Sequence, residues 1–311
     1  MEAHQAGVRC RLSAPDLATL DPRLATLRRM KRRPRIALLG ALACLVALVA
    51  VWAVAYLAPF GRWLDDVTLM GFVDLHSRGI DRLATGVVRL ADPQPFLVAG
   101  AALVAVALAR SRPRTAAVVP LVLLGANLTT QLLKPELAHP RMTSILADTH
   151  IQAASWPSGH ATGAMSLALC AVLVSSPRLR PLIAALGGTF AVAVGYATLV
   201  LAWHLPSDVL AGFLVATLWT TLGIAALWAA ATRWPERAGR GREAALRVGE
   251  AITPSALTAV AATACAGALV LARPDAALAY AQGHTVFVVG AVVIGLLGAT
   301  LAAALAVALR R

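Results

Sequence analysis

Long apolar runs set the strongest limit on what this chain can fold into. Six of them have about 20 residues, the length that an α-helix needs to cross the hydrocarbon core of a bilayer, and they lie at 36–58, 114–133, 157–175, 180–203, 207–231 and 285–308. Two shorter runs lie at 95–110 and 255–272. Because lipid offers no partner to backbone polar groups, each run is predicted to form a helix. The expected fold class is therefore an all-α, polytopic membrane helix bundle with eight spans.

The composition agrees with a chain that is solvated by lipid. Of the 311 residues, 59% are hydrophobic and only 14% are charged, and a soluble core of this size could not hide so much apolar surface. The net charge of +13 raises nucleic-acid binding as an alternative. However, the Arg residues stand between apolar runs and not on one soluble face with interleaved aromatic residues. Membrane lipids are therefore the expected partners, and nucleic acid is not.

Clusters of Arg give the spans a predicted orientation. They lie at 28–35, 110–114, 178–180, 233–247 and 310–311, and all fall on one side of the membrane if eight spans alternate. Positive charge in short loops marks the cytoplasmic side. This arrangement predicts a multi-pass protein of the cell (plasma) membrane with both termini in the cytoplasm. The segments that then face outward are 59–94, 134–156, 203–206 and 273–284.

The same pattern divides the chain into four parts. They are a basic cytoplasmic tail at 1–35, a six-span core at 36–231, a basic cytoplasmic linker at 232–254 and a C-terminal transmembrane helix pair at 255–311. Residues 61–94 have apolar positions at helical spacing but too many charges to cross lipid, so helices lying on the outer surface are expected there. The four cysteines have no disulfide or zinc spacing.

Three groups of polar residues stand at the ends of spans, and all three fall on the outward side. They are Lys134 with Arg141, Trp156-Pro157-Ser158-Gly159-His160, and His204-Leu205-Pro206-Ser207-Asp208. Ionisable residues at membrane edges are costly, so their gathering on one side indicates a functional site. Each group alone could be a headgroup anchor or a helix cap. Their shared order, spacing and sidedness favour a single site.

The residue types suit a phosphate monoester. Lys134 and Arg141 would neutralise phosphate oxygens, Lys as a point charge and Arg through its bidentate fork. Pro157 favours the first turn of a helix, where Ser158 and Gly159 would present a hydroxyl and backbone N–H groups to an anion. These residues therefore predict an anion site at the start of the fourth span.

Two histidines could carry the chemistry. His160 would sit one position inside that helix and face the same anion. Asp208, four residues after His204, can accept a hydrogen bond from one ring nitrogen of His204. The other nitrogen is thereby fixed as an unprotonated nucleophile. Trp156 and Trp203 are more typical of the aromatic belt at the membrane interface than of a substrate clamp.

The three groups resemble the pattern of the type-2 phosphatidic acid phosphatase and haloperoxidase superfamily. That pattern is Lys, six residues, Arg-Pro; then Pro-Ser-Gly-His; then Ser-Arg, five residues, His, three residues, Asp. Most of it is found here between Lys134 and Asp208. The resemblance covers residues 36–231 and not the last two spans. It implies six core spans with the site at the outer face.

The resemblance also implies a role for each matching residue. His204 would be the phosphohistidine nucleophile, Asp208 its orienting partner and His160 the general acid for the leaving group. The phosphate would be held, without a metal ion or another cofactor, by Lys134, Arg141, Ser158 and Gly159. The implied activity is metal-independent hydrolysis of a phosphoric ester or anhydride, on a phosphomonoester or diphosphate of a polyprenyl or phosphatidate-like lipid.

The sequence departs from the family pattern in two places. Met142 stands where the family has Pro, and Ala197-Thr198 stands where it has Ser-Arg, whose Arg is a phosphate ligand. Thr198 offers a neutral hydroxyl in place of that charge. A second interpretation therefore stays open, a catalytically impaired lipid-phosphate binding or translocating protein on the same fold. A transporter of another kind would need charges or broken helices at the membrane midplane, and the sequence has none that is convincing.

Overall fold

The structure is a computed structural model that describes residues 22–138, 151–233 and 274–309. Every regular element in these ranges is an α-helix, which confirms the expected all-α fold class. The helices are α1 (Pro22–Leu57), α2 (Pro59–Val73), α3 (Arg78–Arg89), α4 (Pro93–Ala109), α5 (Pro113–Glu136), α6 (Gly159–Val174), α7 (Arg180–Val200), α8 (Pro206–Arg233), α10 (Pro274–Gly283) and α11 (Thr285–Ala308).

Proline marks where several of these helices begin. Pro59, Pro93, Pro113 and Pro206 are the first residues of α2, α4, α5 and α8. Proline is favoured at this position because its ring holds φ near the helical value and because no helical acceptor exists for an N–H there. The start of α8, whose first turn contains Asp208, is therefore encoded locally.

The long apolar runs of the sequence all correspond to apolar helices. Five helices are long and apolar enough to cross a membrane, namely Arg33–Leu57 of α1, α5, α7, α8 and α11. The run 157–175 forms α6, which is shorter, and the run 95–110 forms α4, which makes a pair with α3 that is bent by 46°. The run 255–272 and most of the linker 232–254 lie outside the described residues.

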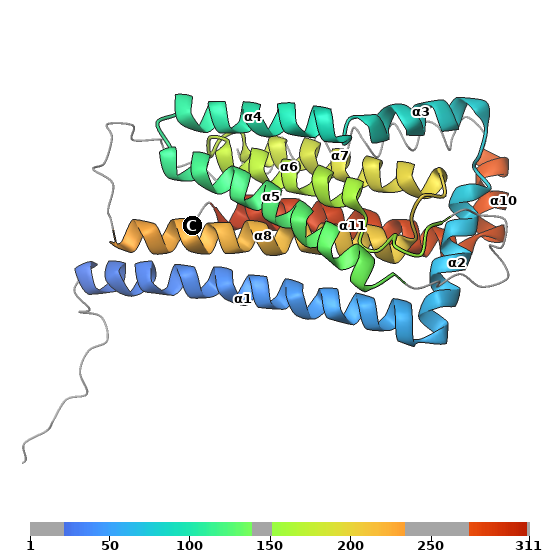
Figure 1. Cartoon of the computed structure of the whole chain (residues 1–311), viewed down its shortest axis with the longest axis horizontal. Helices are drawn as coiled ribbons and strands as arrows, with labels where there is room; N and C mark the ends of the chain where they lie inside the picture. The colour runs from blue at the N-terminus through green and yellow to red at the C-terminus, as the bar shows by residue number, and fades with distance from the viewer. Residues whose placement is uncertain (1–21, 139–150, 234–273, 310–311) are drawn as a thin grey trace, which may run out of the picture.

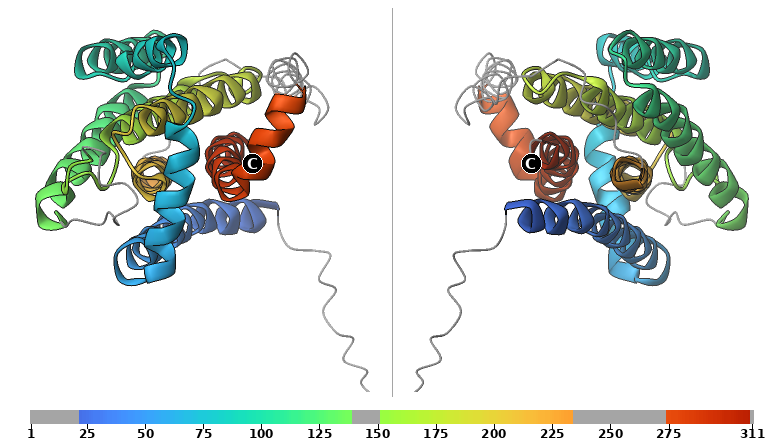
Figure 2. Two further views of the ribbon diagram at one scale, coloured as in Figure 1. Left: turned by 90° about the vertical axis from the view of Figure 1, so that its right-hand side faces the viewer. Right: turned by 90° about the vertical axis from the view of Figure 1, so that its left-hand side faces the viewer.

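Most helices run along a common axis, and the connections between them lie at the two opposite ends of the bundle (Figure 1). The α4–α5 and α6–α7 connections, which contain Arg110, Arg112 and Arg178, lie at one end together with the last residues of α8 and α11. The end of α5, the start of α6 and the α7–α8 connection lie at the other end, which α2 crosses. In the middle, α8 contacts α1, α5, α6 and α11 and is enclosed by them (Figure 2).

The structure agrees only in part with the helices expected on the outer surface in residues 61–94. α2 lies across the end of the bundle, but α3 runs beside α7 and continues the line of α4. Ala84 and Val88, one helical turn apart, are buried, whereas Arg78, Arg82 and Arg89 are exposed. This narrow apolar stripe lets α3 pack along the bundle while its charges face outward. The expectation of a helix lying flat on the surface is therefore wrong for α3.

α11 belongs to the same bundle as the core. At one end, Nη1 of Arg180 in α7 donates to the carbonyl oxygen of Leu309 at 2.8 Å. Near the other end of α7, the hydroxyl of Tyr196 donates to the carbonyl oxygen of Ala291. Small residues allow the helices to approach, since a Cβ added to Gly298 would lie 2.6 Å from a side-chain atom of Val192 in α7. The last described span is thus an integral part of the fold.

Candidate active site

The end of α7 sets the direction of the chain that leads to His204. The N–H of Trp203 donates to the carbonyl of Thr198 at 3.0 Å and that of Ala202 to the carbonyl of Leu199 at 2.9 Å, which is the Schellman pattern that satisfies the last carbonyls of a helix. Ala202 has a φ of 53°, a left-handed conformation that costs an L-residue other than Gly about 1–2 kcal/mol. The chain therefore leaves α7 in a defined direction.

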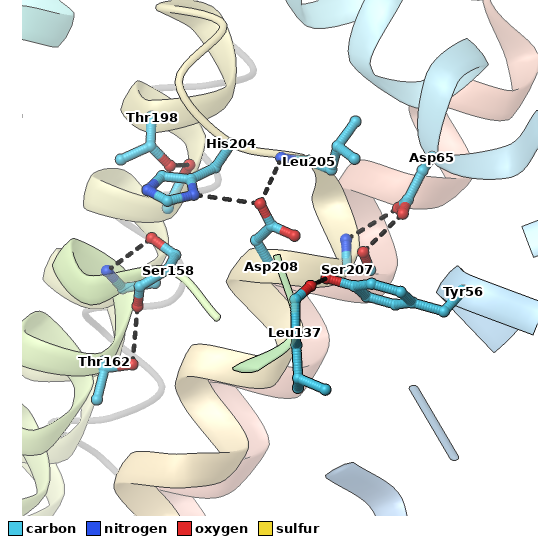
Figure 3. A network of polar contacts seen from close by, with 12 residues as sticks. Tyr56, Asp65, Leu137, Ser158, Thr162, Thr198, His204, Leu205, Ser207 and Asp208 are labelled. Carbon is cyan, nitrogen blue, oxygen red and sulfur yellow. Dashed lines mark hydrogen bonds and ion pairs between the residues drawn. The ribbon is translucent and has the colours of Figure 1, made fainter. Parts of the chain in front are cut away.

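His204 and Asp208 form a buried pair at the start of α8. Nδ1 of His204 lies 3.2 Å from Oδ2 of Asp208, and the same oxygen accepts a hydrogen bond from the Leu205 N–H at 3.1 Å. His204 is 7% exposed and Asp208 0%. An ionised Asp208 carboxylate only accepts hydrogen bonds, and with Asp208 in this form the ring proton of His204 lies on Nδ1. The other nitrogen, Nε2, lies on the side of Ser158 (Figure 3).

Ser158 caps the N-terminus of α6. Its Oγ accepts a hydrogen bond from the Ala161 N–H at 3.3 Å, and its own N–H donates to the backbone carbonyl of Asp208 at 3.0 Å. This second bond joins the first turns of α6 and α8. Pro157 was expected in the first turn of α6 but precedes the cap, because Ser158 takes the N-cap position.

α6 and α8 approach closely because Gly212 has no side chain. A Cβ at this position would lie 2.9 Å from the carbonyl oxygen of Ser158 and 3.0 Å from the backbone nitrogen of Thr162. Thr162 donates its hydroxyl hydrogen to the carbonyl of Ser158 at 2.7 Å, and Oγ1 of Thr130 in α5 donates to Oγ1 of Thr162 at 3.2 Å. The start of α6 is therefore held by contacts from both α5 and α8.

Lys134 brings a positive charge to the start of α6. It lies in the last turn of α5, and a Cβ added to Gly159 would lie 3.8 Å from its Nζ. Gly159 and His160 are the first residues of α6, where backbone N–H groups have no helical acceptor. An ammonium group and a helix N-terminus both attract anions. This end of the bundle thus has the charge and the donors that a phosphate group needs.

His160 contacts Asp92, a residue that the sequence analysis did not identify. Nε2 of His160 lies 3.2 Å from Oδ1 of Asp92, which is 68 residues away in the chain. The ring centroids of His160 and Trp203 are 5.8 Å apart. Trp203, which was expected in the aromatic belt, therefore lies beside one of the site histidines. The only local signal for Asp92 is an acidic residue directly before Pro93 at the start of α4.

The remaining predicted positions have different outcomes. Thr198 is 0% exposed, its hydroxyl donates to the carbonyl of Gly195 in its own helix at 2.7 Å, and it lies beside His204 (Figure 3). Arg141 and Met142 lie outside the described residues. Within the part of the chain that the structure describes, no group of three or more His, Cys, Asp or Glu side chains could hold a metal ion.

Residues 115–234, which cover nearly all of α5 to α8, match the family model of the PAP2 superfamily. This part of the chain belongs to the PAP2 superfamily. The family that the sequence motifs indicated is therefore confirmed, and at the level of the family the match supports a membrane lipid phosphatase. The PAP2 region contains both site histidines, Asp208 and Lys134, but neither Asp92 nor α2 and α11.

The comparisons with individual proteins give one structural match. The chain is similar to the crystal structure of the first transmembrane PAP2-type phosphatidylglycerolphosphate phosphatase from Bacillus subtilis, with 20% sequence identity and a TM-score of 0.49. The similarity covers 64% of this chain and 99% of that chain. No curated protein matches the sequence.

The close contact at Gly212 leads to a first prediction. Gly212→Ala should push the start of α6 away from α8 and lower the free energy of unfolding by about 1–3 kcal/mol, as overpacking of a dense core does. Gly86→Ala is the matched control, because a Cβ on this helical glycine meets nothing within 4 Å; it should be neutral or stabilising. Thermal unfolding in detergent compares the two variants. Equal melting temperatures would contradict the contact.

Proposed function

We propose that this PAP2 protein hydrolyses a phosphomonoester or diphosphate of a lipid through a phosphohistidine intermediate on His204. The observation that carries the proposal is the buried His204–Asp208 pair. It lies at the same end of the bundle as Lys134 and the N-terminus of α6. A nucleophile with a defined lone pair and an anion-binding helix end thus share one site.

In the first step, Nε2 of His204 attacks phosphorus and the bond between phosphorus and the leaving-group oxygen breaks. The electron pair of that bond stays on the leaving oxygen, which needs a proton. His160 supplies it as the general acid: one ring nitrogen donates to Asp92 and the other carries the transferred proton. Asp208 keeps the Nδ1 proton in place and stabilises the positive charge that develops on the His204 ring.

In the second step, a water molecule attacks the phosphohistidine and the nitrogen–phosphorus bond breaks. His160, now neutral, accepts a proton from this water, so inorganic phosphate leaves and both histidines return to their starting states. In both steps Lys134, Arg141 and the N–H groups at the start of α6 would stabilise the phosphoryl oxygens. No step in this scheme uses a metal ion or another cofactor.

The site is proposed to face the outside of the cell membrane. The connections rich in Arg lie at the opposite end of the bundle, and such connections mark the cytoplasmic side. α11 ends there and α1 begins there (Figure 1), which would place both termini in the cytoplasm. The ends of α5 and α6 then lie at headgroup level in the outer leaflet. This placement favours a lipid substrate there, either a polyprenyl phosphate or diphosphate or a phosphatidate-like lipid.

One observation favours a second candidate function. Thr198 is buried and hydrogen-bonded within α7, so it brings no charge to the position where the family has an Arg. Losing one preorganised donor to a transition state costs about 3 kcal/mol, a factor of a hundred or more in rate. The alternative is a lipid-phosphate binding or translocating protein that keeps the fold and the anion site but has lost turnover.

The deciding prediction concerns His204. The purified protein, reconstituted with a panel of lipid phosphates, should release inorganic phosphate in the presence of chelator, and vanadate should block the release. His204→Ala should lower the rate about a thousandfold or more, because it removes the nucleophile, whereas His76→Ala, a change to an exposed histidine paired with Asp81, should not. If the protein binds lipid phosphates but releases inorganic phosphate from no member of the panel, the binding function replaces the enzymatic function.

The role of His160 leads to a prediction about leaving groups. His160→Ala should slow phosphate release from an alkyl lipid phosphate by about a hundredfold or more, since general acid catalysis contributes that much. The loss should be far smaller for 4-nitrophenyl phosphate, whose leaving group departs without a proton. Asp92→Asn should show the same contrast in weaker form. Equal losses on both substrates would remove His160 from the role of general acid.

The orientation leads to a labelling prediction. In a variant without the native cysteines, an impermeant maleimide added to intact cells should modify Ala138→Cys, at the exposed end of α5. It should modify Ser176→Cys, in the α6–α7 connection, only after the membrane is opened. The reverse pattern would place the site in the cytoplasm.

A further inference from the structure

The N-terminus of α8 is capped by a residue from a distant helix. α8 begins at Pro206, so Leu205 holds the N-cap position, where its apolar side chain cannot accept a hydrogen bond from the first turn. Asp65 of α2 takes this place. Its Oδ1 accepts from the Ser207 N–H at 2.9 Å and its Oδ2 from the Ser207 hydroxyl at 2.6 Å. Both residues are buried, at 7% and 6% exposure.

We propose that Asp65 is a positioning residue for the His204–Asp208 pair. Ser207 is the neighbour of Asp208, and both belong to the first turn of α8. Two hydrogen bonds from one carboxylate fix Ser207 in translation and rotation, and with it the direction in which Asp208 reaches His204 (Figure 3). The inference rests on the proposed role of His204 as nucleophile. Asp65 lies outside the residues that match the PAP2 family.

α2 can act in this way because its other side is held by the C-terminal helices. His284, just before α11, contacts Asp74 at 2.9 Å, and the hydroxyl of Tyr280 in α10 donates to the carbonyl of Gly71. The rings of Phe72 and Phe287 pack edge to face with centroids 4.8 Å apart. α2 thus contacts both α11 and α8, and the C-terminal helices hold the part of α2 that follows Asp65.

A positioning role and a purely structural role differ in what they change. If Asp65 only stabilises the fold, its loss lowers the melting temperature but leaves the turnover of each folded molecule intact. If Asp65 positions the pair, its loss lowers kcat, because a displacement of about 1 Å at a reacting group costs up to about a hundredfold in rate. KM should stay near the parent value, since the anion is held by Lys134 and the start of α6.

The experiment compares Asp65→Ala, Ser207→Ala and the double variant with the parent protein. Asp65→Ala should lower kcat for lipid phosphate about tenfold to a hundredfold. Ser207→Ala should have a smaller effect, because the backbone N–H still donates. The double variant should be no slower than Asp65→Ala alone, since the two residues act as a unit. Asp81→Asn is the control, because it removes a carboxylate from an exposed contact with His76, and it should leave kcat unchanged.

A second readout separates this inference from the proposed function. Orthovanadate should raise the melting temperature of the parent and of Asp81→Asn, and the rise should be weaker in Asp65→Ala, even if the parent shows no turnover. Asp65→Asn, which keeps one acceptor oxygen, serves if Asp65→Ala does not fold. Parental kcat together with a parental vanadate response in a folded Asp65 variant would overturn the inference. Losses that multiply in the double variant would also overturn it.

Discussion

The site depends on how the backbone N–H groups at the start of α8 are hydrogen-bonded. A helix leaves its first N–H groups without intrahelical partners, and an N–H without a partner is costly in a protein that is surrounded by lipid. Leu205 cannot cap α8 with its side chain, so two carboxylates do so: Asp208 accepts from the Leu205 N–H and Asp65 from the Ser207 N–H. Asp208 also holds Nδ1 of His204. One oxygen atom therefore serves both the folding of α8 and the orientation of the proposed nucleophile.

The N-termini of α6 and α8 use the same electrostatics for different partners. Both point toward the end of the bundle that carries the site, and each presents a partial positive charge there. At α8 this charge is met by protein carboxylates. At α6 the cap is the neutral Ser158, and both the ammonium of Lys134 and the carboxylate of Asp92, which contacts His160, lie near this helix start. Because the α6 cap carries no charge of its own, the partial positive charge of this helix end can contribute to the proposed binding of phosphate.

Local patterns predict much of this molecule. The length of the apolar runs predicts the spans, and a proline marks the start of α2, α4, α5 and α8, whereas Pro34, Pro120 and Pro135 lie inside helices. The spacing of four residues between His204 and Asp208 predicts a contact across the start of α8. Ala202 is an exception to these local patterns, because it adopts a left-handed conformation at the end of α7 without being a glycine.

Local patterns do not predict contacts between segments that are distant in the sequence. Asp65 reaches Ser207 across 142 residues and Asp92 reaches His160 across 68, so neither spacing carries information. The charges of residues 61–94 correctly argued against an ordinary span, but they could not tell a helix that lies across the bundle from one that runs along it. α3 runs along the bundle because Ala84 and Val88 form a narrow buried face on it, and because α3 meets α4 at a bend of 46°.

The charge balance of the site bears on how the missing Arg at position 198 could be tolerated. The described part of the site holds the carboxylates of Asp65, Asp92 and Asp208, and Lys134 at the start of α6. A phosphate monoester near neutral pH adds up to about two further negative charges. Asp65 and Asp208 accept hydrogen bonds from N–H groups of α8, and Asp208 also lies within electrostatic reach of Lys134. In the proposed mechanism, the phosphate would be balanced by Lys134, the α6 N-terminus, Arg141 and the general acid His160 in its protonated form. Under the proposed mechanism, Thr198 makes turnover depend more strongly on these four than it would in a PAP2 site that has an Arg at this position.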